Sequence, residues 1–158
     1  MATHSTYLHS QLITTHANTL ILPNIAVAEI VNYSEPESVT NAPEWLIGMV
    51  QWRGLKIPLI SFERAAGQSA PNPSAKNRIA VLNALGGDGS LHYFAIVTKG
   101  LPRLVNVERK GIVATESSEA EKFVLAKVVV NEIPAVIPDL DAVEEMIKTQ
   151  GIKVTKIH

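Results

Sequence analysis

The sequence predicts an all-β protein made of small barrels, with short helices and one helix near the C-terminus. Two observations favour this fold class. The chain contains about nine or ten short β-prone runs separated by turn signals. It lacks the regular alternation of strand and helix that is typical of parallel α/β sheets. With 158 residues it has room for one domain, or for two very small ones that share a core.

Composition and charge exclude several classes of function. The net charge of −1 leaves no overall field that would attract a phosphate backbone or an anionic membrane. The absence of cysteine removes disulfides, thiol nucleophiles and cysteine metal sites. No secretory signal is visible at the start, and no apolar run approaches the length that spans a bilayer. We therefore expect a soluble cytoplasmic protein without direct membrane insertion.

The N-terminal third predicts a flexible tail followed by three strands. Residues 1–9 are polar and form the expected tail. Ser10–Thr14 and Thr19–Pro23 are β-prone runs on either side of a turn at 15–18, which predicts a hairpin. Ile25–Tyr33 predicts the next strand.

Glu29 is a carboxylate among aliphatic neighbours in this third strand. The two-residue period of a strand places it on the same face as Ile25, Val27 and Val31. A lone buried carboxylate is costly, so Glu29 either lies on a solvent-exposed face or is paired, and Arg53 is the partner we expect. Periodicity alone leaves both alternatives open.

The central stretch predicts a hairpin with an unusual turn. Ile47–Trp52 and Leu55–Phe62 are rich in β-branched and aromatic residues, and Arg53-Gly54 lies between them. Gly54 supplies a positive φ in either of two turn types. Arginine at the first central position is tolerated in a type II turn but unexpected in a primed turn, where it would indicate that Arg53 makes an outside contact.

After this hairpin the chain divides. Ser61 is expected to cap one helical turn that ends at Gly67. Residues 68–77 carry two prolines and small polar side chains, which predicts a linker that cannot order itself by burial. We expect this linker to separate a first barrel of about 10–67 from a second barrel and terminal helix at 78–148.

The second half predicts further strands and the helix. The expected strands are Arg78–Leu85, Ser90–Thr98, Arg103–Val107, Phe123–Val130 and Ala135–Ile137. Their connections are a glycine turn at 86–89, a break at 99–102, a polar loop at 115–122 and a turn at 131–134. Asp139 is expected to cap a helix with an apolar stripe of Leu140, Val143, Met146 and Ile147. Such a stripe is more often core than partner surface. Residues 149–158 form the expected C-terminal tail.

No catalytic, metal or cofactor site stands out, so we do not expect an enzyme. The histidines show no metal-ligand spacing, and no serine has the strand-turn-helix context of an exposed nucleophile. The glycine turn at 86–89 lacks a phosphate-binding pattern. A modest basic edge at 99–110 is interrupted by Glu108 and has few stacking aromatics, which argues against nucleic acid.

Surface recognition remains, because small barrels offer strand edges and grooves to partners. Trp45 and Trp52 flank the central hairpin, and exposed aromatics of this kind anchor interfaces. We expect Trp45 to be exposed and Trp52 to be partly buried. A small barrel that binds nucleic acid or a small molecule is the alternative, and for a small molecule it predicts a deep pocket.

One run of residues resembles a known family. Pro43, Gly48, Arg53, Gly54, Pro58 and Gly67, preceded by Val27-Ala28-Glu29-Ile30-Val31, match the order and spacing of the CheW-like adaptors. The resemblance implies two SH3-like five-stranded barrels joined by a hydrophobic interface. It also implies a noncatalytic adaptor that holds the cytoplasmic tip of a chemoreceptor and the CheA-like regulatory domain of a histidine kinase. The chain would then be recruited to membrane-bound receptor arrays.

The resemblance assigns candidate residues and also shows departures. Val27, Glu29, Arg53 and Gly54 match positions in the half that helps to form or support these contacts, and Trp45 is added as an exposed aromatic. Gln51-Trp52 replaces the usual Asn-Leu, Ser61-Phe62 the usual Asp-Leu, and Val97-Thr98 the usual Val-Asp. These departures favour an accessory adaptor, as in systems that control type IV pilus twitching.

Overall fold

The computed structural model describes residues 7–85, 91–108, 112–114 and 122–157. Most of the described chain is β-strand, with short helices and one longer helix near the C-terminus, so the predicted fold class is confirmed. The elements in order are β1 (Tyr7–Thr14), β2 (Thr19–Pro23), η1 (Asn24–Ala26), β3 (Val27–Asn32), β4 (Leu46–Trp52), β5 (Leu55–Ile60), α1 (Phe62–Ala65), β6 (Asn77–Asn83), β7 (Tyr93–Glu108), β8 (Ile112–Ala114), β9 (Val124–Val130), β10 (Ile133–Pro138), α2 (Leu140–Thr149) and β11 (Thr155–Lys156).

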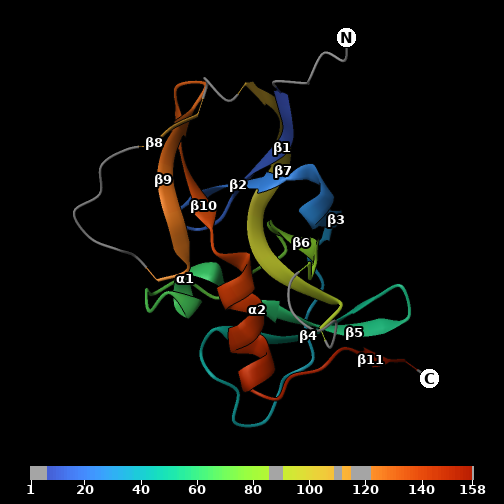
Figure 1. Cartoon of the computed structure of the whole chain (residues 1–158). Coiled ribbons are helices and arrows are strands. Elements are labelled where there is room, and N and C mark those ends of the chain that lie inside the picture. Colours follow the sequence, from blue (N-terminus) through green and yellow to red (C-terminus); the bar gives the residue numbers. More distant parts are fainter. Residues whose placement is uncertain (1–6, 86–90, 109–111, 115–121, 158) are drawn as a thin grey trace.

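Ten of the eleven described strands form two groups of five within one hydrogen-bonded network, and the short β11 pairs with β5 at the edge of the first group (Figure 1). The first group runs β3-β6-β7-β5-β4, and the second runs β1-β2-β10-β9-β8. The long curved strand β7 joins them, because its first part pairs with β5 and β6 and its second part pairs with β1. Within the described residues neither group closes into a complete barrel, although each has the five strands that were expected.

Strand pairing crosses the division that the sequence predicted at 68–77. β3 pairs with β6 and β5 pairs with β7, so strands from before and after residues 68–77 build the first group. The N-terminal hairpin of β1 and β2 belongs instead to the second group, where β2 pairs with β10, while β1 pairs with the second part of β7. The two groups are therefore interlocked, and they differ in membership from a first barrel of 10–67 and a second of 78–148.

β7 continues through the predicted break at residues 99–102. It is 16 residues long, and the irregularity appears as a bulge in its pairing with β1. Thr14 pairs with Lys99, whereas Leu12 pairs with Arg103, so β7 contains extra residues at this point. Gly100 takes a φ of +59°, which suits the bend. The predicted break was therefore wrong, and the glycine and proline mark a bulge within one continuous strand.

The largest core cluster lies between the two groups of strands and under α2. It joins Leu20 and Leu22 of β2 to Leu82, Phe94 and Ile147, all of them fully buried. Two smaller clusters lie one within each group, around Ile57 in the first and around Val128 in the second. A shared apolar layer therefore fixes the groups against each other.

Several local predictions are confirmed. Ser61 caps α1 by accepting a hydrogen bond from the Arg64 amide, and Gly67 follows with a φ of +84°. Asp139 caps α2 by accepting from the Ala142 amide. Val143 and Ile147 of the apolar stripe are buried, which makes the stripe core. The glycine turn at 86–89 and most of the polar loop at 115–122 lie outside the described residues.

The segment at 68–77 is held in place by hydrogen bonds, contrary to the predicted linker. The Arg64 guanidinium donates to the Ala70 carbonyl at 2.9 Å and to Asn72 Oδ1 at 2.9 Å. It also donates to the Glu44 carbonyl at 3.3 Å. Most of this segment is exposed, as the sequence predicted, and hydrogen bonds from Arg64 tie its first half to α1 and to the Glu44 carbonyl.

The C-terminal residues are not a free tail. Thr155 and Lys156 form β11, which pairs antiparallel with the start of β5. Within the described part of the chain no helix is both long and apolar enough to cross a membrane.

Candidate docking surface

The turn that carries Arg53 is a primed turn. Arg53 has a φ of +47° and Gly54 a φ of +78°, and two successive positive φ values define type I′. Of the two turn types that the sequence left open, the structure shows the one in which arginine is unexpected. Nothing lies within 4 Å of a Cβ built on Gly54, so the turn is open to solvent. The Arg53 side chain is accordingly 67% exposed.

Arg53 pairs with Glu29 across the strands, as predicted. Arg53 Nη2 lies 3.1 Å from Glu29 Oε1, and the Glu29 side chain is 42% exposed. The same oxygen accepts a hydrogen bond of 3.0 Å from Trp52 Nε1. The Arg53 guanidinium also lies over the Trp52 ring, 4.8 Å from its centroid. One carboxylate therefore orients both a cation and an indole.

Trp52 forms the floor of this arrangement. It is 8% exposed and belongs to the core cluster of the first strand group. Its ring meets Tyr93 of β7 edge to face, with centroids 4.9 Å apart and an interplanar angle of 64°. Glu29, Trp52, Arg53, Gly54 and Tyr93 are called the Arg53 surface below.

The contacts of the Arg53 surface position side chains more than they stabilise the fold. Exposed ion pairs contribute about 0–1 kcal/mol, and exposed cation–π contacts about 0.5–1 kcal/mol. Both depend here on the Arg53 side chain, which is 67% exposed. An arginine held over a buried tryptophan loses less freedom when a partner binds, which is a property of interface anchors.

β3 departs from the two-residue period that the sequence predicted. Its pairing with β6 shifts between Val27 and Glu29, which marks a bulge. As a result Val27 and Ile30 pack on the central core, whereas Ala28 and Val31 pack on the core of the first group. Val27 is half-buried and supports the fold beside the Arg53 surface without belonging to it.

Trp45 is not exposed, contrary to the prediction. It is half-buried and packs against the central core, away from the cluster that contains Trp52. Its carbonyl accepts from the Ser61 amide at 2.9 Å, so it lies where β4 meets the α1 cap. Trp52 is more buried than expected. Trp52 occupies an inward-facing position at the end of β4, and Trp45 directly precedes β4, where it packs against the central core.

Some contacts were not predicted from the sequence. Glu63 is 2% exposed and accepts hydrogen bonds from Thr15 Oγ1 at 2.6 Å and from Asn18 Nδ2 at 2.7 Å, which ties α1 to the first hairpin.

Tyr33 packs on the same core cluster as Trp52. Burial, and then the neighbouring Glu35 carboxylate, raise the pKa of Tyr33, so its phenol stays protonated through the physiological range.

A pocket of about 420 Å³ lies beside the 68–77 segment and is separate from the Arg53 surface. Ile47, Pro71 and Val97 contribute apolar wall, and Lys76 and Lys99 contribute charge. Among the described residues no group of three or more His, Cys, Asp or Glu side chains could hold a metal ion. None of the predicted partner-binding residues lines the pocket.

The family match decides the identity of the fold. A family model described as the CheW-like domain matches residues 11–148. The chain belongs to this family.

A solved structure shows the same CheW-like fold. It is the scaffolding protein TtCheW from Thermoanaerobacter tengcongensis, with a TM-score of 0.69 and 16% sequence identity. The similarity covers 84% of this chain and 88% of that chain. The comparison with curated proteins found no match.

A loop covers the outer edge of β4 in this CheW-like chain. Glu37 exchanges two backbone hydrogen bonds with Met49, of 2.8 and 2.9 Å. The Glu37 side chain also binds Lys56 Nζ at 2.8 Å, so the loop is fixed to both strands of the hairpin. Covering an edge strand in this way protects it from pairing with other chains.

Gly48 is expected to be essential for packing the Glu37 loop against β4. A Cβ at Gly48 would lie 2.6 Å from the Glu37 carbonyl oxygen and 2.8 Å from Pro36 Cβ. Gly48→Ala should therefore push the loop off β4 and lower the free energy of unfolding by about 1–3 kcal/mol. Urea denaturation of Gly48→Ala beside Ala66→Gly measures this, since Ala66 lies outside the clash. An unchanged midpoint for Gly48→Ala would contradict the close approach.

Proposed function

We propose that this chain is a noncatalytic adaptor that couples chemoreceptors to a histidine kinase. The observation that carries the proposal is the Arg53 surface, an exposed arginine on a strained turn that is oriented by one carboxylate and one buried indole. Membership in the CheW-like family supports it, as does the likeness to a protein described as a scaffolding protein.

The proposed partners are the cytoplasmic tip of a chemoreceptor and the CheA-like regulatory domain of a kinase. Of the candidate residues, Glu29, Arg53 and Gly54 are assigned to partner contact, because their side chains or backbone are exposed at the turn. Val27 and Trp45 are assigned to supporting the surface, since both are half-buried against the central core.

Such an adaptor acts by holding its two partners close together. Holding a receptor and a kinase in one assembly replaces a bimolecular encounter by an intramolecular one, and effective concentrations between tethered modules reach the millimolar range. Individually weak contacts then give a stable array. We place the protein in the cytoplasm, recruited to membrane-bound receptor arrays, and we assign it as an accessory adaptor in a system that controls type IV pilus twitching.

Capture by purified partners tests the proposal. The chain is immobilised and offered the kinase regulatory domain or a receptor helical hairpin from the same cell. We expect each to be retained alone, and the two together to be retained more strongly than either. Co-purification from the native cell then identifies the kinase and the receptor, and deletion with a twitching assay tests the output. Failure to retain any regulatory domain or receptor hairpin from the native cell would overturn the adaptor assignment.

A further inference from the structure

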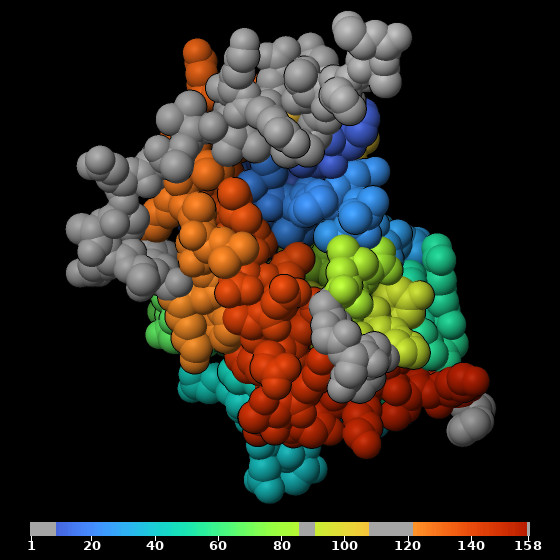
Figure 2. All heavy atoms as spheres, viewed as in Figure 1, coloured from blue at the N-terminus to red at the C-terminus, as the bar shows by residue number. Residues whose placement is uncertain are grey.

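The C-terminal residues 152–157 lead to the turn end of the hairpin that carries Arg53. Ile152 packs against the central core, and Val154 packs against both that core and the core of the first strand group. β11 then pairs with β5 in the register Thr155 to Lys56 and Lys156 to Leu55. Figures 1 and 2 show this red segment running from α2 toward the same side of the molecule as β5.

The segment ends on the turn itself. The Ile157 amide donates a hydrogen bond of 2.8 Å to the Gly54 carbonyl. Gly54 and Arg53 both hold positive φ values, and for arginine this conformation is disfavoured by about 1 kcal/mol or more. An external hydrogen bond to the second turn residue therefore helps to keep Arg53 where Glu29 and Trp52 can orient it.

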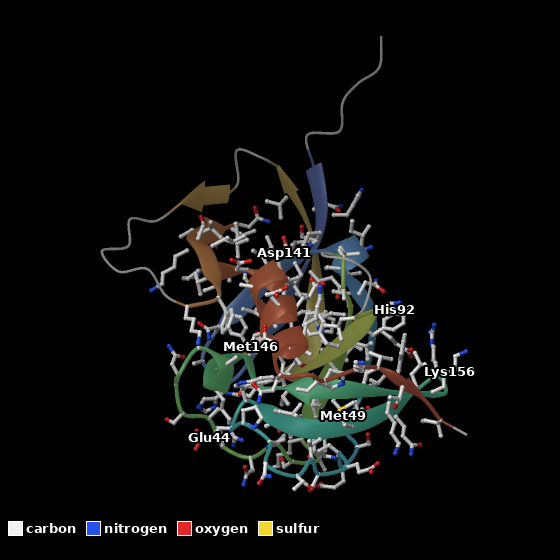
Figure 3. All side chains as sticks on the ribbon, turned by 60° about the horizontal axis from the view of Figure 1, so that its bottom comes forward. Glu44, Met49, His92, Asp141, Met146 and Lys156 are labelled. Atoms are coloured by element: carbon white, nitrogen blue, oxygen red, sulfur yellow. The ribbon has the colours of Figure 1, made fainter. Side chains whose placement is uncertain are left out.

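The same segment changes the charge near the turn. Arg53 is paired with Glu29, and Lys56 is paired with Glu37, so these four charges compensate one another. Lys153 and Lys156 are exposed, and no ion pair to either occurs within the described part of the chain. In Figure 3 Lys156 lies at the end of the molecule reached by the β4–β5 hairpin. Within residues 152–157, these two lysines therefore carry positive charge that no ion pair among the described residues compensates.

We propose that residues 152–157 are a working part of the docking surface. Ile157 positions the Arg53 turn, and Lys153 and Lys156 make the surface complementary to an acidic patch on a protein partner. This inference rests on the proposed function, in that the partner is the one that the Arg53 surface binds. Beyond the proposed function, it assigns residues 152–157 two roles, which are to hold the Arg53 turn in place and to supply positive charge for the partner.

The positioning role can be tested without any partner. Ile157→Pro removes the amide that donates to Gly54, and proline is compatible with an extended edge segment. Ile157→Ala is the matched control, because it shortens the side chain and keeps the donor. We expect faster amide hydrogen exchange at residues 53–56 and a shifted Trp52 indole N–H signal in Ile157→Pro alone, with Trp45→Phe used to assign the two indoles. Equal behaviour of the two Ile157 variants would overturn the positioning role.

The charge role is tested with the kinase regulatory domain and the receptor hairpin. Lys156→Glu should weaken binding at low ionic strength by about fivefold or more, and the loss should shrink as salt is added. Lys76→Glu is the control, since it makes the same charge change at an exposed site just before β6. Equal effects of the two variants, or no effect of Lys156→Glu, would overturn the charge role.

The Ile157 and Lys156 experiments can distinguish a failure of this inference from a failure of the proposed function. If the unmodified chain binds no regulatory domain or receptor hairpin, the proposed function fails and the hydrogen-exchange result still decides whether Ile157 holds the turn. If the unmodified chain binds and a chain ending at Gly151 binds more tightly, the segment covers the surface instead of contributing to it. That result would overturn the inference while leaving the adaptor function in place.

Discussion

Arg53→Glu is expected to lower the affinity for the kinase regulatory domain by about tenfold or more while the fold remains intact. A tenfold loss corresponds to about 1.4 kcal/mol, and arginines at the centre of an interface often contribute 2 kcal/mol or more. The substitution reverses the charge that projects from the turn and places a second carboxylate beside Glu29. Binding by surface plasmon resonance, with circular dichroism of the same samples, measures both parts of the prediction.

The fold should survive because little of its stability depends on Arg53. The side chain is 67% exposed, and its ion pair with Glu29 is of the solvent-exposed kind that contributes about 0–1 kcal/mol. Glutamate at a positive φ is no more strained than arginine there, since both carry a Cβ. The melting temperature should therefore change by only a few degrees.

Arg53→Asn separates the role of the side chain from that of the turn. Asparagine followed by glycine is the preferred pair for a type I′ turn, so this variant should be at least as stable as the unmodified chain. It removes the guanidinium that lies over Trp52 and pairs with Glu29. We expect weaker partner binding together with an unchanged or higher melting temperature. Full binding by Arg53→Asn would show that Arg53 serves only the fold.

Local features of the fold could be predicted because their causes are local in the sequence. The Arg53-Gly54 turn, the Ser61 and Asp139 caps and the apolar stripe of α2 each follow from a few neighbouring residues. The ion pair of Glu29 with Arg53 could also be predicted, since a carboxylate among aliphatic residues requires a partner or solvent. The choice between the two turn types could not, because both tolerate glycine at the second position.

Long-range pairing could not be predicted from those signals. Short strands of similar composition do not specify their neighbours, so the pairing of β3 with β6 across residues 68–77 was missed. The bulge between Val27 and Glu29 depends on that pairing, and it moved Val27 to the central core. The strand in the supposed tail, β11, comprises only Thr155 and Lys156, and its partner β5 lies far away in sequence.

Ile147→Ala is expected to destabilise the protein by about 2–5 kcal/mol, the range for removing a large aliphatic side chain from a packed core. Ile147 is fully buried on α2, in the cluster that joins the two strand groups. The substitution leaves a cavity at the junction that holds the groups together. Urea denaturation followed by circular dichroism gives the change in the free energy of unfolding.

Glu145→Ala on the same helix is the matched control, because Glu145 is exposed and its loss should change stability by less than about 0.5 kcal/mol. The comparison also decides what the apolar stripe of α2 does. A stripe that serves as core must cost stability when Ile147 is truncated, whether or not a partner is present. If Ile147→Ala were as stable as Glu145→Ala and instead lost partner binding, the stripe would be a docking face. The burial of Ile147 between the strand groups would then be incorrect.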